Sequence, residues 1–336
     1  LTGENKIITF CKDSKVSLDI TSLSAIRKLS NLESIKTVED YYPQLRILNI
    51  TGSINYKKIL GDKKSREYGM YLKANIEESL KLLTSYHTEI FPVRRNCYKN
   101  LNQVLLGEEL LDLPTYNHAG VTGRTSITNG FNYLTMKKEK RKRLTSPNNK
   151  VLVEVDFKSC EPFFYLKSNN YNLDAERDVY HWIASNYKVS IESRDKFKRG
   201  ILSMLYGANE YTTAKVMQID MSTVKRIKEE LGINKLKQRL EEEYNNNNFV
   251  LNYYGRPITS DNNLVNYWIQ SSAVDFCSLA FNNFCERNNI RPSFFIHDSM
   301  TFEIEKERLS EITKIADILE PTSKISIPVE FSILSK

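Results

Sequence analysis

The chain has 336 residues, of which 40% are hydrophobic and 26% charged, values typical of soluble globular proteins. They exclude collagen-like, intrinsically disordered and disulfide-scaffold classes, and the length allows two or three compact units with a shared core. Lysine and arginine number 48 against 41 aspartates and glutamates, so the net charge of +7 favours a polyanionic partner.

Cysteine usage and hydropathy indicate the compartment. The five cysteines show no C-x-x-C pair or metal-ligand spacing, so we expect neither a zinc site nor a disulfide framework. No apolar run is long enough to span a membrane, and the N-terminus lacks a secretory pattern. We therefore expect a cytoplasmic protein (in the host cytoplasm if it is viral) with no membrane partner. The chain begins at Leu1 rather than Met, which indicates a processed or truncated product.

The first half of the chain is the harder half to interpret. Residues 1–65 show no recognisable pattern beyond one apolar run. From about Arg66 to Leu113, apolar residues recur at helical spacing, including at Leu101 and Val104, and this predicts two or three helices. The polar stretch Gly123–Leu144 ends in the basic run Lys137–Arg143, which is predicted to be a solvated loop.

The second half has stronger patterns. Val151–Asp156 alternates β-branched residues and predicts a strand with an aspartate at its end. The remaining expected elements are helices at Ala175–Tyr187, Ile191–Tyr206, 222–244 and Leu264–Asn288, a strand at Phe249–Tyr254, a hairpin at Ser293–Ile304, and a terminal helix and strand.

Two carboxylates stand where apolar strands end or turn, Asp156 and Asp298. Burying an unpaired charge is costly, so each aspartate should cap a helix, form an ion pair with a lysine or arginine, or bind a cation. Together they could hold two Mg²⁺ ions, which prefer oxygen ligands and keep positions free for substrate phosphates.

Four residues of the 191–206 helix are spaced by four and therefore form one stripe: Arg194, Lys198, Leu202 and Tyr206. The stripe is long enough for two cations to hold a triphosphate while the last two side chains meet sugar and base. The alternative is an ordinary amphipathic surface helix with a buried tyrosine.

Five segments, in order, resemble motifs of the family A DNA polymerases, the bacterial polymerase I group. Asp156–Glu161 resembles the first palm motif D-Y-S-Q-I-E, the Arg194–Gly207 stripe resembles the nucleotide-binding fingers helix, and Ile296–Ser299 resembles V-H-D-E. Asn266–Ala273 is similar to N-x-x-x-Q-G-x-A, and Thr122–Ser126 is similar to T-G-R-L-S. The resemblance covers about residues 66–336.

The resemblance implies roles at the nucleotide. Asp156 and Asp298, with the backbone carbonyl of Phe157, would hold two Mg²⁺ ions, for which Mn²⁺ would substitute. Arg194 and Lys198 would bind the β- and γ-phosphates, and Lys198 would protonate the leaving group. The substrate site would be completed by Leu202, by Tyr206 near the templating position, and by Glu161 as a steric gate against a 2′-hydroxyl.

It also implies contacts with primer-template DNA. Arg124, Asn266 and Gln270 would contact minor-groove acceptors, and His297 would touch the primer end. Tyr254 and Arg256 are further candidate contacts, the tyrosine by stacking on template bases. The alternative for Tyr254 is ordinary packing, which is usual for tyrosines in strands.

The expected fold class is α+β, a right-hand polymerase fold with an antiparallel palm sheet, helical fingers and a short helical thumb. The predicted domains are an N-terminal segment of unknown role, a thumb, a first part of the palm, fingers, and a second part of the palm, at residues 1–65, 66–118, 119–165, 166–250 and 251–336. The expected activity is primer-dependent DNA synthesis from dNTPs by a monomer, without proofreading in this chain, and residues 1–65 are available for a replication partner.

Two departures from the family keep alternatives open. Ser299 replaces an acidic residue, and I-H-D-S resembles the related single-subunit phage RNA polymerases, so an RNA polymerase or primer-synthesising enzyme is one alternative. Against it, Glu161 stands where those enzymes have a small residue. Leu202 replaces an aromatic residue, which weakens the expectation about sugar discrimination.

The second alternative is a non-catalytic nucleic-acid-binding module.

Overall fold

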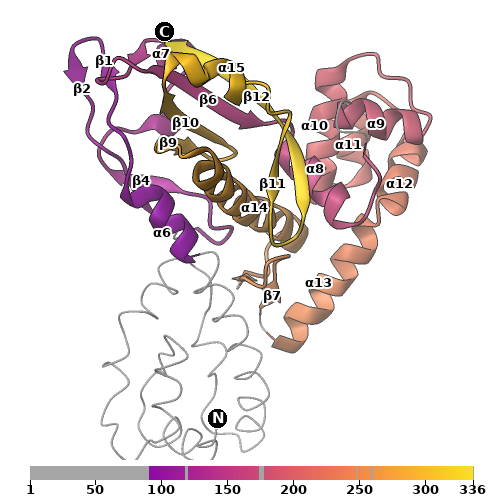
Figure 1. The fold of residues 1–336 in the computed structure, drawn as a ribbon. Coiled ribbons are helices and arrows are strands. Elements are labelled where there is room, and N and C mark those ends of the chain that lie inside the picture. Colours follow the sequence, from indigo (N-terminus) through magenta and orange to yellow (C-terminus); the bar gives the residue numbers. More distant parts are fainter. Residues whose placement is uncertain (1–90, 118–119, 174–177, 248, 259, 336) are drawn as a thin grey trace, which may run out of the picture.

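A computed structural model describes residues 91–335 apart from 118–119, 174–177, 248 and 259 (Figure 1). The predictions for residues 1–65 and for helices at 66–90 lie outside the described residues. Within the described part, no helix is both long and apolar enough to cross a membrane.

A five-stranded antiparallel sheet forms the centre of the molecule. Its strand order is β11-β12-β6-β10-β9, which confirms the predicted antiparallel sheet. The strands are β6 (Val151–Phe157), β9 (Pro292–Ile296), β10 (Ser299–Ile304), β11 (Asp317–Glu320) and β12 (Ile325–Ser335). The short helices η5 (Lys306–Arg308) and α15 (Leu309–Ile312) connect β10 to β11, as expected for a terminal helix and strand.

The alternation of residues in β6 divides the sheet into two faces. Val151, Val153, Val155 and Phe157 belong to the main core, which lies against helices α8 (Cys160–Ser168) and α14 (Leu264–Asn288). The other face carries three residues, Leu152, Glu154 and Asp156. Only Asp156 among the residues of β6 is exposed, because the strand ends there and the layer that covers Leu152 stops short of it.

That layer is built from the segment between residues 101 and 150. It contains β1 (Leu105–Leu106), β2 (Glu109–Leu110), β3 (Thr115–Asn117), β4 (Ser126–Asn129), η4 (Tyr133–Thr135), α7 (Lys138–Arg141) and β5 (Leu144–Thr145). A second core cluster joins it to the sheet through Leu144, Tyr133 and Leu152, and the ring of Tyr133 stacks on Phe294 at 4.1 Å.

The helical prediction for 101–113 is therefore wrong. The basic run Lys137–Arg143 is mostly exposed, as predicted, but α7 gives it one turn of helix. Leu105 pairs with Leu110 across a turn that contains Gly107 at φ 67°, a conformation that favours glycine. The apolar spacing fitted a helix, but the turn and the pairing of β1 with β5 satisfy the backbone as strands. The only helix described in this part of the expected thumb is α6 (Phe91–Lys99), which packs against α14 and β9.

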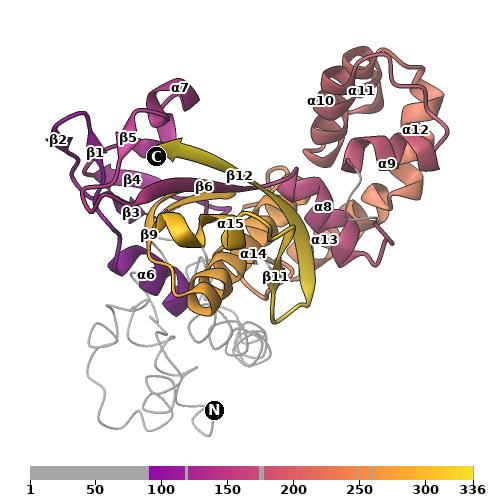
Figure 2. The same cartoon turned by 45° about the horizontal axis from the view of Figure 1, so that its top comes forward.

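A separate group of helices, the helical lobe, lies at the opposite end of the sheet from the β1–β5 layer (Figures 1 and 2). It comprises α9 (Val179–Asn186), α10 (Arg194–Leu205), α11 (Glu210–Met217), α12 (Met221–Glu230) and α13 (Ile233–Asn247). Consecutive helices pack on one another, and α13 leads back to α14 through the two-residue strands β7 (Val250–Leu251) and β8 (Pro257–Ile258).

Candidate active-site cleft

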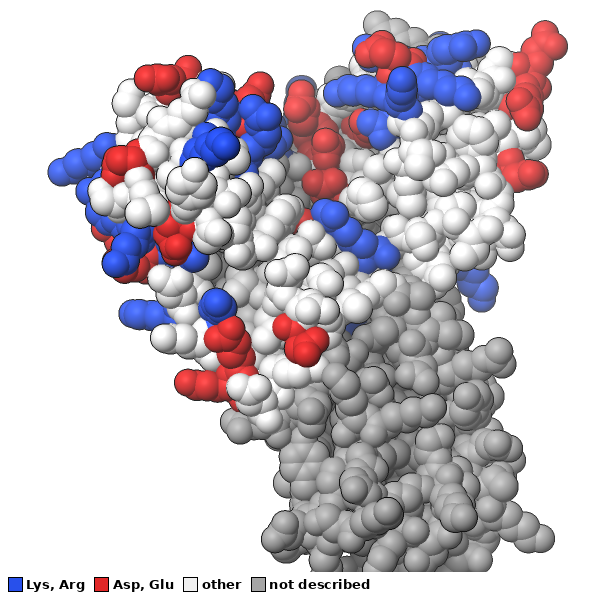
Figure 3. Space-filling model, turned by 180° about the vertical axis from the view of Figure 1, so that it is seen from behind, with Lys and Arg blue, Asp and Glu red and all other residues white. Residues whose placement is uncertain are grey.

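A cleft of about 1050 Å³ lies between the sheet and the helical lobe. Seen from behind, the molecule is hollowed between two lobes that both carry basic side chains, and acidic side chains lie in the hollow (Figure 3). The predicted residues that line the cleft are Arg124, Asp156, Phe157, Glu161, Arg194, Lys198, Leu202, Tyr206 and Asp298. The fold thus brings residues of four of the five motifs to one cleft: several from Asp156–Glu161 and from the α10 stripe, and one each from the motifs of Arg124 and Asp298.

The two aspartates meet through backbone pairing. Asp298 lies in the two-residue turn between β9 and β10, where His297 adopts φ 51°. The amide of Phe157 donates a hydrogen bond to the carbonyl of Asp298 at 3.1 Å, and Ser299 is the cross-strand partner of Asp156. Residues separated by more than 140 positions are therefore neighbours because β6 and β10 are paired.

Both carboxyl groups have raised pKa values. The side chain of Asp156 opens into the cleft, but the protein around it displaces much of its water, and this desolvation raises its pKa to about 7. The charges of Asp298, Glu154 and Glu330 add to the effect, and that of Arg141 opposes it. Glu330 is the partner of Asp156 on β12, so two like charges face each other directly. Burial also raises the pKa of Asp298, and the nearby cations Arg124 and Lys198 oppose the shift.

This carboxylate pair fits a divalent cation. Among the described residues neither aspartate forms an ion pair, although the strands hold their like charges close together. The described residues contain no cluster of three or more His, Cys, Asp or Glu that could hold a metal by itself. A cation here would therefore take its other ligands from phosphate oxygens and water, as Mg²⁺ commonly does.

The predicted stripe occupies one face of α10, and the opposite face is buried. Phe197, Ile201, Met204 and Leu205 pack in the core, which orients the stripe towards the cleft. The helix ends at Leu205, and Tyr206 is its C-terminal cap. The spacing by four therefore predicted the geometry correctly, whereas the predicted start at Ile191 was three residues early.

Arg194 has a partner that sequence reasoning missed. Its Nε donates to Asp178 at 2.8 Å and its guanidinium forms an ion pair with the same carboxylate. Asp178 also caps α9 by accepting from the amides of Tyr180 and His181, and the ring of Tyr180 lies under both Arg194 and Lys198. Partial burial alone would raise the pKa of Asp178, but its hydrogen bonds and its ion pair with Arg194 lower it. The same ion pair raises the pKa of Arg194.

Glu161 lies between two of the other predicted residues. One carboxylate oxygen accepts from Arg124 at 2.8 Å, and the other accepts from the hydroxyl of Tyr206. The side-chain amide of Gln270 in α14 in turn donates a hydrogen bond to the hydroxyl oxygen of Tyr206. The structure therefore connects four motifs in a single chain of polar contacts.

The other predicted contacts lie outside the cleft. Asn266 is half-buried, and its buried Oδ1 has no hydrogen-bond partner among the described residues. His297 lines a small adjoining pocket with Arg124, and the surrounding protein and the Arg124 charge lower its pKa.

The structure does not place Tyr254 and Arg256 where they could contact nucleic acid. Tyr254 is buried, and its hydroxyl donates to Glu320 at 3.1 Å. Arg256 is completely buried. The exposed tyrosine of this segment is its neighbour, Tyr253. The prediction of a nucleic-acid contact at Arg256 required a surface residue, but the tertiary fold directs this arginine inwards.

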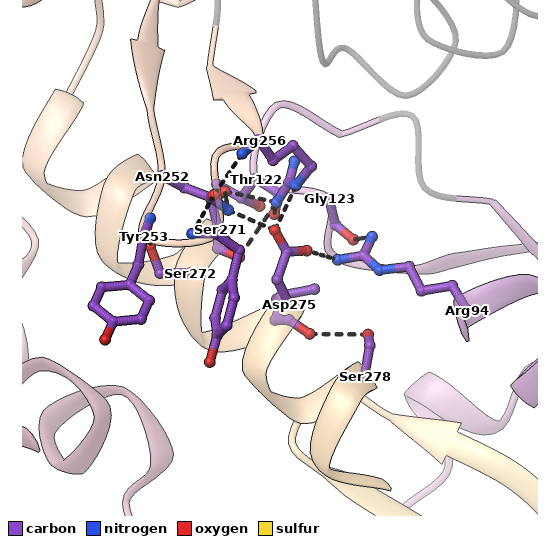
Figure 4. Close-up of polar contacts among 12 residues, drawn as sticks. Arg94, Thr122, Gly123, Asn252, Tyr253, Arg256, Ser271, Ser272, Asp275 and Ser278 are labelled. Atoms are coloured by element: carbon purple, nitrogen blue, oxygen red, sulfur yellow. Dashed lines mark hydrogen bonds and ion pairs between the residues drawn. The ribbon is translucent and has the colours of Figure 1, made fainter. Parts of the chain in front are cut away.

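Arg256 belongs to a buried polar cluster that sequence reasoning missed (Figure 4). The cluster centres on Asp275 of α14, which accepts from Arg94, from Arg256 at 2.9 Å and from Asn252 at 2.5 Å. Asp275 is the only charged residue in the first 22 positions of α14. A single carboxylate in so long an apolar helix indicates a buried ion pair, so the sequence did contain a signal for this cluster. We define the buried arginine network as Arg94, Arg256 and Asp275.

No family model matches the chain, and no curated protein matches it in sequence. Among solved structures, it is similar to the POL domain of Pol1 from M. smegmatis in complex with DNA primer-template and dNTP. The TM-score is 0.48 and the identity 14%, over 98% of this chain and 64% of that one. At this low similarity, the chemistry of the cleft is inferred from its own residues alone.

Proposed function

We propose that the protein is a nucleotidyltransferase that extends a primer on a nucleic-acid template, with dNTPs as substrates. The observation that carries this proposal is the cleft itself. Two carboxylates with raised pKa values on the sheet lie across one cavity from two cations of α10. Opposed anionic and cationic walls suit a metal-bound triphosphate better than a nucleic-acid backbone alone.

Asp156 and Asp298 would hold the divalent ions, with the Phe157 carbonyl as a further ligand. When bound, such ions lower the pKa of an attacking hydroxyl and stabilise the charge on a leaving pyrophosphate. Mg²⁺ is the expected ion, and Mn²⁺ is the expected substitute.

The cations of α10 would bind the triphosphate. Arg194, whose Nε and Nη2 both donate to Oδ2 of Asp178, would exchange this carboxylate for phosphate oxygens, which a guanidinium can bind through two nitrogens. Lys198, one turn further along, would bind the β- or γ-phosphate and donate a proton to the leaving group. Tyr206, at the end of the helix, would meet the base.

Glu161 would select the sugar. Its carboxylate is fixed by Arg124 and Tyr206 at the wall of the cleft, and its side chain is only 11% exposed. A side chain held this firmly cannot move away to admit a 2′-hydroxyl, so ribonucleotides would be excluded by steric conflict.

One observation favours a second candidate, RNA synthesis. Ser299 stands where the polymerase I motif has a second acidic residue, and its hydroxyl donates to the carbonyl of Ile296 at 3.2 Å. This position therefore contributes no carboxylate. The fixed Glu161 favours dNTPs over this alternative.

The test is extension of a labelled primer on a DNA template with Mg²⁺ and either dNTPs or NTPs. We expect extension with dNTPs alone, NTP use by Glu161→Ala, and preserved selectivity in Glu161→Gln, which retains the volume of the side chain. Efficient extension with NTPs by the wild type would assign the protein to RNA synthesis. Salt-sensitive nucleic-acid binding without any extension would favour a binding module instead.

A further inference from the structure

Hydrogen bonds from the buried arginine network fix the loop that precedes Arg124. The guanidinium of Arg256 donates to the carbonyl of Thr122 at 2.6 Å and to that of Val121 at 3.5 Å. The guanidinium of Arg94 donates to the carbonyl of Gly123 at 3.1 Å. The three carbonyl groups immediately before Arg124 therefore point towards the two guanidiniums, and Figure 4 shows those of Thr122 and Gly123.

Burial of the two guanidiniums explains why the loop is drawn inwards. Arg94, Arg256 and Asp275 are each at most 1% exposed, and Asp275 accepts from both arginines. A buried charge is costly unless polar groups surround it. The carbonyl oxygens of residues 121–123 supply negative dipole ends, together with the hydroxyl of Ser271, which lies 2.6 Å from Arg256.

The inward carbonyls decide the direction of the next side chain. Gly123 turns the chain at φ 68°, and its amide donates to the carbonyl of Gly120 at 2.7 Å. Arg124 then projects into the cleft and holds Glu161. The contacts therefore run without interruption from Asp275 through both arginines and the loop to Glu161.

We propose that Asp275, with Arg94 and Arg256, is a positioning set that fixes Arg124 and, through it, the sugar-selecting position of Glu161. This inference rests on the proposed function, and it adds residues that never touch the substrate. Asp275 aligns the two guanidiniums, the guanidiniums fix the loop, and the loop aims Arg124. Loss of the central carboxylate would loosen sugar selection more than it lowers turnover.

The experiment compares Asp275→Asn with a matched buried carboxylate outside the network, Glu320→Gln. Glu320 is fully buried and accepts from the amides of Thr322 and Ser323. We measure kcat/KM for dNTPs and for NTPs and form their ratio. Asp275→Asn should lower this ratio by about 10- to 100-fold, the range expected when a positioning contact shifts by about 1 Å. Glu320→Gln should leave the ratio unchanged even if it lowers stability.

A double-mutant cycle separates positioning from a general loss of structure. In an Arg124→Ala background, Asp275→Asn should cause no further change in the ratio, because its effect passes through Arg124. Equal losses for dNTPs and NTPs in Asp275→Asn, or an undiminished effect in the Arg124→Ala background, would overturn the proposal.

Hydrogen exchange provides a test that does not depend on activity. The Gly123 amide and its neighbours should exchange faster in Asp275→Asn than in wild type, and the Glu320→Gln variant should leave them unchanged. Arg256→Lys should behave like Asp275→Asn, since one ammonium cannot replace a guanidinium fork. Unaltered exchange in Asp275→Asn would refute the positioning role, whereas absence of extension by the wild type would refute the proposed function instead.

Discussion

Substitution of Gly123 by alanine tests how closely the Arg124 loop approaches the network. The residue has φ 68°, and a Cβ atom there would lie 2.7 Å from Nη2 and 2.8 Å from Cζ of Arg256. Arg256 cannot retreat, because it is completely buried and its guanidinium donates to Asp275, Thr122 and Ser271. The new methyl group must therefore displace either the loop or the guanidinium.

The expected cost has two parts. A left-handed residue other than glycine costs roughly 1–2 kcal/mol. Loss of one hydrogen bond to a charged group costs a further amount of about 1.5–3 kcal/mol. Gly107 is the matched control, because its φ is 67° but nothing lies within 4 Å of its added Cβ. Gly107→Ala should therefore show the first part alone.

The assay is urea unfolding of wild type and both variants, compared by free energy of unfolding. Gly123→Ala should be less stable than Gly107→Ala by about 2 kcal/mol, the lost hydrogen bond being the difference. A difference below about 0.5 kcal/mol, the usual range for substitutions away from such features, would refute the close packing of loop and guanidinium.

Three further substitutions test the cleft. Asp298→Asn should lower extension by more than about 100-fold, a loss typical of removed transition-state stabilisation. The variant should still bind duplex in a filter assay. Near-normal extension would contradict the cation-binding role. Asp156→Asn should stabilise the metal-free protein at pH 8 but not at pH 4, because the folded pKa of about 7 lies above the ordinary 3.8, so ionisation between these values weakens the wild-type fold. A melting-temperature difference independent of pH would refute that shift. Asp178→Asn retains a residue that caps helices well and removes the charge that pairs with Arg194, so the KM for the triphosphate should fall several-fold. A raised KM would mean that Asp178 instead holds Arg194 in its working position.

Elements with strong local patterns were predictable from the sequence. The helix at Leu264–Asn288 and the β9–β10 hairpin occur as predicted, because a long apolar pattern and a two-residue turn each specify one conformation. The segment at 101–113 was not predictable in this way, since short apolar runs fit a helix or a strand equally and the pairing with β5 decided the outcome.

The sequence by itself determined which side chains share a face. Spacing by four placed Arg194, Lys198, Leu202 and Tyr206 along one side of α10, and alternation placed Asp156 on the face of β6 opposite its valines. Both results follow from the fixed geometry of a helix and a strand, which needs no knowledge of distant partners.

Only the tertiary structure decided what those side chains meet. It paired Arg194 with Asp178, directed Arg256 inwards to Asp275, and buried Tyr254 while exposing Tyr253. Each of these outcomes depends on strands and helices far apart in the chain being packed together, and on the cost of burying a charge without a partner. No local pattern carries that information.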